Sequence, residues 1–176
     1  MTSIPEPTLM EKYVLDTSFF LDLWKVDAPF SKEIFVGIWD ALQEAIACGE
    51  VVAPSSVKEE LRREKTDRDL KSWVSDHAGI FIPFDEGQLA VVAEIVRRFP
   101  GYALGVKNLA DPQIVALAYM RDLTVLTSEK WVSTLANDNP KMPNVCKSFG
   151  IKSLNIRSYC TAEGIELHRA PQASNQ

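Results

Sequence analysis

The sequence predicts an α/β protein in three layers: a mostly parallel central sheet with helices packed on both of its faces. Short apolar runs alternate along the chain with longer segments of helical periodicity. The first runs also lack the alternating polar residues of a sheet that has one face in water. A chain of 176 residues, 46% of them hydrophobic, has the size of one domain and can bury a core. We expect an irregular leader over residues 1–11, a folded domain over 12–165 and an exposed tail over 166–176.

Five strands are predicted from short runs that are rich in apolar and β-branched residues. The third run contains Pro83, which lacks an N–H group and therefore favours an edge position. The predicted strands cover residues 13–16, 51–53, 80–84, 123–127 and 152–156.

The helices are predicted from apolar residues at helical spacing and from residues that favour helix ends. Ser31, Asp85 and Asp111 have the chemistry of residues that begin helices, and Gly49 and Gly150 that of residues that end them. The helix that starts at 85 would place Leu89, Val92, Ile95, Val96 and Phe99 on one face. The predicted helices cover 17–25, 31–48, 55–71, 85–99, 111–119, 145–149 and 157–167, with a helix fragment and loop over 132–143.

Composition excludes several classes of protein. No basic segment followed by an apolar run begins the chain, and no apolar stretch is long enough to span a bilayer. We therefore expect a cytoplasmic protein that does not bind a membrane. Three widely spaced cysteines (48, 146 and 160) and two histidines (77 and 168) predict neither a disulfide framework nor a zinc site. The net charge of −5 argues against a protein that coats nucleic acid, but not against a nuclease built on carboxylates.

Four carboxylates stand at comparable places in the predicted topology. Asp16 closes the first strand, Glu60 lies in the helix after the second, Asp111 begins a helix and Glu129 follows the fourth strand. The carboxyl ends of parallel strands, and the starts of the helices that follow them, meet at one edge of a sheet. We therefore expect these four side chains to converge on one cleft.

A convergence of carboxylates indicates a site for divalent cations. Like-charged carboxylates raise one another's pKa, and a bound cation relieves this repulsion. Mg²⁺ and Mn²⁺ prefer oxygen ligands, and a pair of such ions can activate water and stabilise the leaving oxygen of a phosphodiester. The sequence thus favours a metal-dependent phosphodiesterase that needs no histidine.

These segments resemble the PIN-domain family of metal-dependent nucleases, including the VapC-like toxins of toxin–antitoxin pairs, and the stretch 141–146 looks like a less-characterised PIN-like branch. The resemblance covers roughly residues 12–160, through the stretches 14–18, 54–61, 110–118 and 126–131. It implies a PIN-like fold and Asp16, Glu60, Asp111 and Glu129 as the catalytic, metal-binding acids. Thr17, Ser18 and Thr127 would orient those acids or a bound water. The fourth position commonly carries Asp in this family, whereas here it carries Glu129. The number of metal ions, one or two, therefore stays open.

The same resemblance implies an endoribonuclease that cleaves single-stranded RNA with Mg²⁺ or Mn²⁺. It would be the toxin of a toxin–antitoxin pair, with RNA as substrate, an antitoxin protein as partner and a homodimer as a further expectation. An antitoxin peptide would cover the cleft and could insert an Arg among the acids.

Other interpretations stay open at this point. Each acid could cap or begin a helix, or pair with a nearby Arg, and Glu59 is the rival of Glu60. The chain could then be a catalytically inactive PIN-like binding module with a structural ion or none. A phosphatase with an aspartate nucleophile would need a second Asp where Ser18 stands. Basic residues could guide a phosphate backbone or simply be solvated: Lys58, Arg62, Arg63, Arg68, Lys107 and Lys130.

Overall fold

Five parallel strands form one sheet in the order β3-β2-β1-β4-β5. The computed structural model describes residues 10–64, 67–102, 110–133 and 140–166. The predicted α/β class is confirmed, and the sheet is wholly rather than mostly parallel. Its strands are β1 (Tyr13–Leu15), β2 (Val51–Pro54), β3 (Phe81–Ile82), β4 (Thr124–Leu126) and β5 (Ser153–Leu154).

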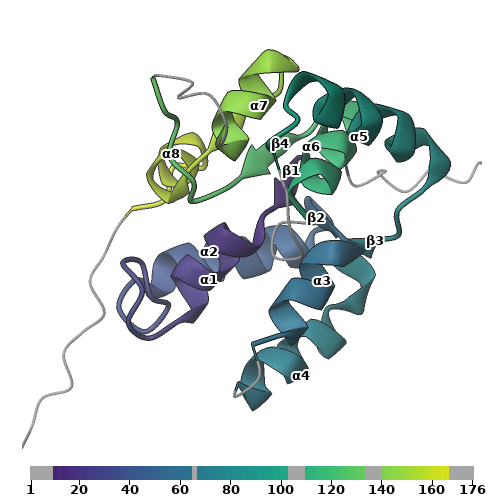
Figure 1. Cartoon of the computed structure of the whole chain (residues 1–176). Coiled ribbons are helices and arrows are strands. Elements are labelled where there is room, and N and C mark those ends of the chain that lie inside the picture. Colours follow the sequence, from purple (N-terminus) through teal and green to yellow (C-terminus); the bar gives the residue numbers. More distant parts are fainter. Residues whose placement is uncertain (1–9, 65–66, 103–109, 134–139, 167–176) are drawn as a thin grey trace, which may run out of the picture.

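Helices cover both faces of the sheet, which confirms the three predicted layers. In Figure 1, α5, α6 and α7 lie on one side of the strands and α1 to α4 on the other. The first group is α5 (Glu86–Arg98), α6 (Ala110–Arg121) and α7 (Met142–Ser148). The second group is α1 (Thr17–Trp24), α2 (Val36–Ala47), α3 (Ser55–Arg62) and α4 (Arg68–Asp76). A 3₁₀ turn, η1 (Ala78–Ile80), precedes β3, and α8 (Ile156–Ala162) follows β5.

The strand order reverses between β1 and β4. From β1 the chain proceeds outward through β2 to β3, and it then returns to the other side of β1 with β4 and β5. Open α/β sheets bind their ligands beyond the carboxyl ends of the strands at such a reversal. Leu15 is paired with Leu126 in the ladder, so Asp16 and Thr127 leave the sheet side by side.

The centre of the sheet is wholly buried, which explains its continuous apolar runs. Val14, Leu15, Val125 and Leu126 have exposed fractions of 0 or 1%. Helix α6 packs against β1, β2 and β4 as well as against α5 and α7. It is accordingly apolar around its circumference rather than on one stripe, and it carries Asp111 in its first turn.

Two predicted helices are wrong in their limits. The helix expected from Ser31 begins only at Val36. Ser31 is buried and lies in a turn instead, where its hydroxyl accepts the N–H of Glu33. The helix expected over 55–71 is two helices, α3 and α4. Asp67 begins the second one by accepting the N–H of Leu70 at 2.9 Å.

Smaller differences concern helix ends and faces. Helix α7 begins at Met142 rather than at 145, and α8 ends at Ala162, ahead of Gly164 with a φ of 64°. On α5 only Ile95 of the predicted apolar face is buried, while Leu89 is 57% exposed. The predicted leader (in part), the loop containing Lys107, and the tail beyond 166 lie outside the described residues. Within the described part of the chain, every helix is too short or too polar to cross a membrane.

Candidate functional site

Asp16 is a buried carboxylate at the carboxyl end of β1. Its side chain is only 4% exposed, and one oxygen, Oδ2, accepts hydrogen bonds from the hydroxyls of Ser18 and Thr127. The Thr127 hydroxyl lies 2.7 Å away. A buried carboxylate needs such donors because it has lost its hydration. The fold therefore holds Asp16 in one orientation with one hydroxyl from the first turn of α1 and one from the end of β4.

The same hydroxyls also bind the backbone that follows β4. The N–H of Ser128 donates to Oγ of Ser18 at 3.0 Å, and the N–H of Glu129 donates to Oγ1 of Thr127 at 3.1 Å. Each hydroxyl thus accepts one hydrogen bond while it donates another to Asp16. This network joins the end of β1 to the segment that carries Glu129.

Glu60 faces the start of α1, whereas Glu59 points outward. Thr17 donates its hydroxyl hydrogen to Oε2 of Glu60 at 2.5 Å. The other oxygen, Oε1, is buried and has no hydrogen-bond partner. Glu59 is exposed and lies 3.8 Å from Arg62 in an ion pair. Of these two rivals, the structure therefore brings Glu60 to the edge of the sheet that holds Asp16.

Asp111 lies in the first turn of α6 and interacts electrostatically with the other three acids. Its pKa is raised to about 8, first by burial and then by the negative charges of Asp16, Glu129 and Glu60. Lys141 opposes this effect with its positive charge. The pKa of Asp16 is raised to about 6, first by burial and then by Glu129 and Glu60, against its two hydroxyl donors. The four predicted acids therefore interact electrostatically at one edge of the sheet.

Glu129 has a structural contact as well as a place in this group. Its Oε2 accepts the N–H of Met142, the first residue of α7, at 2.7 Å. The alternative that Glu129 begins a helix of its own is wrong, because Glu129 lies in an irregular segment and binds the start of α7 instead. One of its two oxygens is thereby used within the fold.

Two further side chains lie beside the acids and were not predicted. Tyr102 is 3% exposed, its hydroxyl has no partner, and its pKa is raised by burial and then by Asp111. Cys146 is buried, and its pKa is raised to about 12, by burial first and then by Asp16. The stretch 141–146 was noted in the sequence and contains this cysteine. Nothing in the pattern around Tyr102 distinguishes it from other aromatic residues.

The acids do not form a compact cage. Across residues 10–64, 67–102, 110–133 and 140–166, no group of three or more His, Cys, Asp or Glu side chains is arranged to hold a metal ion. One or two carboxylates are thus the most that this arrangement offers together. This is the usual situation for Mg²⁺, which keeps several waters and binds one or two carboxylates together with substrate phosphates.

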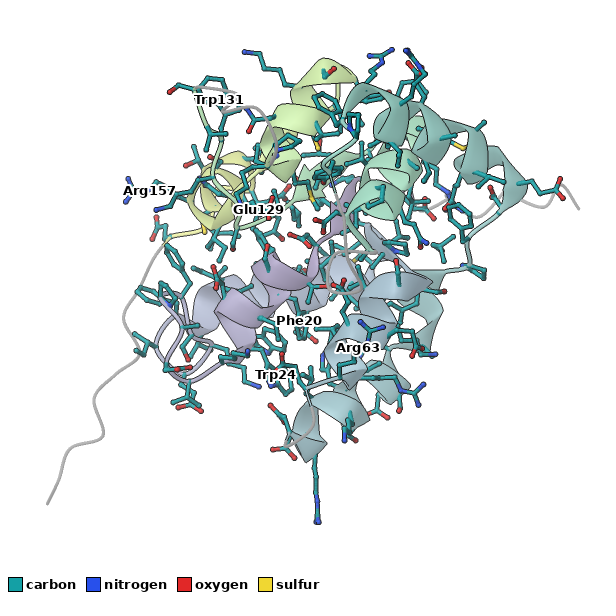
Figure 2. All side chains as sticks on the ribbon, in the orientation of Figure 1. Phe20, Trp24, Arg63, Glu129, Trp131 and Arg157 are labelled. Atoms are coloured by element: carbon teal, nitrogen blue, oxygen red, sulfur yellow. The ribbon has the colours of Figure 1, made fainter. Side chains whose placement is uncertain are left out.

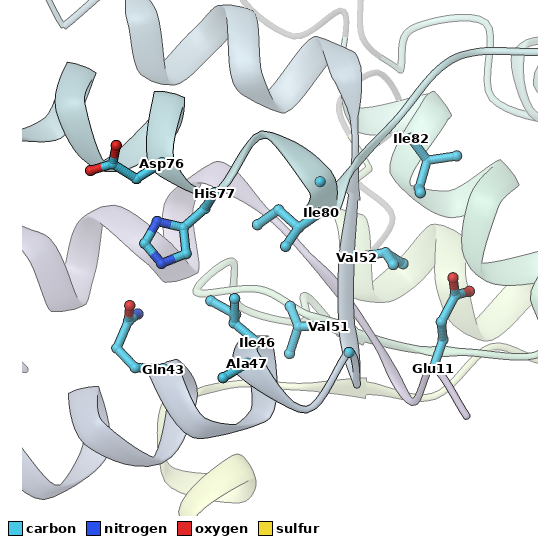
Figure 3. A pocket seen from close by; sticks show the side chains of 12 residues that line it. Glu11, Gln43, Ile46, Ala47, Val51, Val52, Asp76, His77, Ile80 and Ile82 are labelled. Atoms are coloured by element: carbon cyan, nitrogen blue, oxygen red, sulfur yellow. The ribbon is translucent and has the colours of Figure 1, made fainter. Parts of the chain in front are cut away.

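A pocket elsewhere in the fold carries none of these acids. It has a volume of about 530 Å³ and lies between α2, β2 and η1, where Figure 3 shows Ile46, Val51 and Ile80 along its wall. Its polar lining includes His77, whose ring stacks on Trp73 with 4.2 Å between ring centroids. The carboxylate site and this pocket are distinct.

Comparisons with known proteins agree with this architecture. A family model described as "Domain of unknown function (DUF4411)" matches residues 13–167. No curated protein matches the sequence. Among solved structures, the fold is similar to the crystal structure of FitAcB from Neisseria gonorrhoeae, with a TM-score of 0.53, 19% identity and coverage of 82% of this chain and 98% of that one. At this identity the likeness establishes the fold, and it confirms the predicted PIN-like α/β arrangement.

Proposed function

We propose that this chain, which belongs to the family described as Domain of unknown function (DUF4411), is a nuclease that cleaves single-stranded RNA with Mg²⁺ or Mn²⁺. The observation that carries the proposal is the group Asp16, Glu60, Asp111 and Glu129 at the strand-order reversal, where burial and mutual repulsion raise the pKa of two members. Such a group is unfavourable when ionised alone and favourable beside a divalent cation.

Asp16 and Asp111 are the side chains that we assign to the cation, with Glu60 and Glu129 acting directly or through water. The unpartnered Oε1 of Glu60 is an acceptor available to the cation or to one of its waters. Thr17, Ser18 and Thr127 would keep the carboxylates oriented through their hydroxyls. When bound, the ion would lower the pKa of a water molecule and stabilise the leaving oxygen of the phosphodiester.

An antitoxin protein is the partner that we infer from the resemblance to PIN-domain toxins and from the structural likeness to FitAcB. A peptide that inserted an Arg among the acids would replace the cation with a charge-assisted hydrogen bond, and would thereby block the reaction. A homodimer is a further expectation from the same resemblance.

Two observations favour a second candidate, a binding module without catalysis. The side chains described here contain no three-residue metal cluster, and Glu129 already binds the start of α7. In that case the acids would serve as caps and hydrogen-bond acceptors, and the protein would bind divalent cations weakly or not at all.

The test is cleavage of single-stranded RNA by the purified chain with Mn²⁺, together with calorimetry of Mn²⁺ binding. We expect D16N to abolish cleavage and E60Q to reduce it at least a hundredfold, while E59Q stays near wild type because Glu59 faces outward. The nuclease proposal is lost if the wild-type chain cleaves nothing, or if D16N cleaves as well as wild type. Absence of Mn²⁺ binding would favour the binding module.

A further inference from the structure

Trp131 is an exposed aromatic side chain on the segment that carries Glu129. It is 51% exposed and stands two residues beyond Glu129. The other three tryptophans (24, 39 and 73) instead pack against one another and against Phe20. In Figure 2, Trp131 lies at the periphery of the molecule and Glu129 nearer its middle. A single segment therefore carries one acid of the site and one indole ring in contact with solvent.

The segment that carries Trp131 is held firmly against α7. The N–H of Val132 donates to Oδ1 of Asn144 at 3.2 Å, and Nδ2 of Asn144 donates to the carbonyl oxygen of Val132 at 2.8 Å. On the other side of Trp131, Glu129 accepts the N–H of Met142 at 2.7 Å. Two of these hydrogen bonds hold the backbone of Val132, and the third ties the side chain of Glu129 to the start of α7. An exposed ring on a fixed backbone binds a ligand with less loss of conformational entropy than one on a free loop.

One lysine lies against this ring, and two more lie in the segments beside it. The ammonium group of Lys147 lies 5.4 Å from the centroid of Trp131, within the range of a cation–π interaction. Lys147 and Lys130 are both exposed, and Lys141 is close enough to Asp111 to oppose the rise of its pKa. A negatively charged polymer is attracted to this border, although the acids beside it repel phosphate in the absence of a cation.

We propose that Trp131 is a stacking platform for an unpaired base of single-stranded RNA, with Lys147 and Lys130 beside the phosphates of the same strand. The inference rests on the proposed nuclease function and adds how the substrate is held. Aromatic rings that stack on bases beside a cationic border are the usual means of binding single strands without reading their sequence. In a duplex the bases already stack on one another, so the platform selects unpaired RNA.

The experiment measures binding of a fluorescein-labelled short oligouridine by anisotropy, in EDTA and at several salt concentrations. We expect W131A to weaken binding roughly tenfold or more, with an unchanged slope against salt, because stacking releases no counterions. W131F should retain most of the affinity. K147Q should weaken binding and also reduce the salt slope by about one charge. The matched control is L89A, which removes another exposed apolar side chain, 57% exposed, from α5.

Duplex RNA and a parallel cleavage assay separate the possible outcomes. W131A should bind a duplex as the wild-type chain does. The platform is overturned if the wild-type chain binds no single-stranded RNA, or if W131A binds it as tightly as wild type does. It is also overturned if W131A loses affinity for single-stranded and for duplex RNA to the same extent. An unaffected W131A would leave Trp131 as a contact for a protein partner. If the wild-type chain binds single strands through Trp131 but cleaves nothing with Mn²⁺, the nuclease proposal fails and the platform stands.

Discussion

Thr127 donates its hydroxyl hydrogen to Oδ2 of Asp16 across 2.7 Å, and both side chains are almost wholly buried. The two residues come from the ends of β4 and β1, which are neighbours only because the strand order reverses between them. A neutral donor at this distance stabilises the ionised carboxylate without adding a charge of its own. The sheet thus holds a carboxylate beside two hydroxyl donors at a depth where burial alone would favour its protonated form.

Replacement of Thr127 by Val should raise the pKa of Asp16 further above 6, because the substitution removes a donor that lowers it. We expect the loss of stability to be about 1–3 kcal/mol at pH 8, where Asp16 is ionised, and smaller at pH 5. Urea unfolding in EDTA at both pH values measures this. T124V is the matched control, because it removes a hydroxyl from the same strand. Equal losses at the two pH values would contradict the assigned role of Thr127.

Asp111 should make the cation-free protein less stable as the pH rises. Its pKa in the folded chain, about 8, is above the ordinary value of 3.8. Its contribution is therefore fully present below about pH 4 and is lost as the pH rises through 8. From pH 6 to pH 8 we expect a loss of roughly 2 kcal/mol from this group in EDTA.

D111N should remove this dependence, since an amide does not titrate, and should unfold at a higher temperature than wild type at pH 8 in EDTA. The same substitution should abolish the stabilisation that Mn²⁺ gives the wild-type chain. D40N is the control, because Asp40 is exposed on α2. Calorimetric melting at both pH values, with and without Mn²⁺, decides the matter. A D111N chain that keeps the wild-type pH dependence would show that Asp111 is not the titrating group.

Replacement of Tyr102 by Phe should affect the stability of the fold and the affinity for Mn²⁺ differently. The hydroxyl is buried without a partner, so its removal should leave the cation-free stability unchanged or raise it by about 1 kcal/mol. Because the hydroxyl lies near Asp111, Glu129 and Asp16 and has no other partner, it is free to bind a water of the cation, and we expect Mn²⁺ affinity to fall about tenfold. Urea unfolding and calorimetric titration measure the two effects. A loss of stability with unchanged Mn²⁺ affinity would make Tyr102 a core residue only.

The sequence was most informative where the geometry of the sheet alone determines position. Buried parallel strands require continuous apolar runs, so β1 and β4 were recognisable, and the residue after each strand had to emerge at the same edge. The interaction of Asp16 with Glu129 follows from that arrangement. The preference for Glu60 over Glu59 depended on the resemblance of the stretch 54–61 to the PIN-domain family. Helical spacing alone does not determine which of two adjacent residues faces the sheet.

Contacts between distant segments account for most of what the sequence did not predict. The start of α7 depends in part on Glu129, which lies 13 residues earlier and accepts the N–H of Met142. Tyr102 is notable only because burial leaves its hydroxyl among acids, and no local pattern carries that information. The break between α3 and α4 is of the same kind in part, since the charged stretch around it consists mostly of good helix formers and the contact of Asp67 with Trp24 joins distant segments.

Asp67 shows why that helix breaks and how the break can be tested. Its Oδ1 accepts the N–H of Leu70 at 2.9 Å, and its Oδ2 accepts the indole N–H of Trp24 at 2.6 Å. These bonds lower the pKa of Asp67, so its contribution is present above about pH 4 and is lost as the pH falls further. D67A should cost about 1–3 kcal/mol in urea unfolding at neutral pH, whereas D67N should cost less, because Asn also caps helices. A D67A chain as stable as wild type would mean that neither the cap on Leu70 nor the contact with Trp24 stabilises the start of α4.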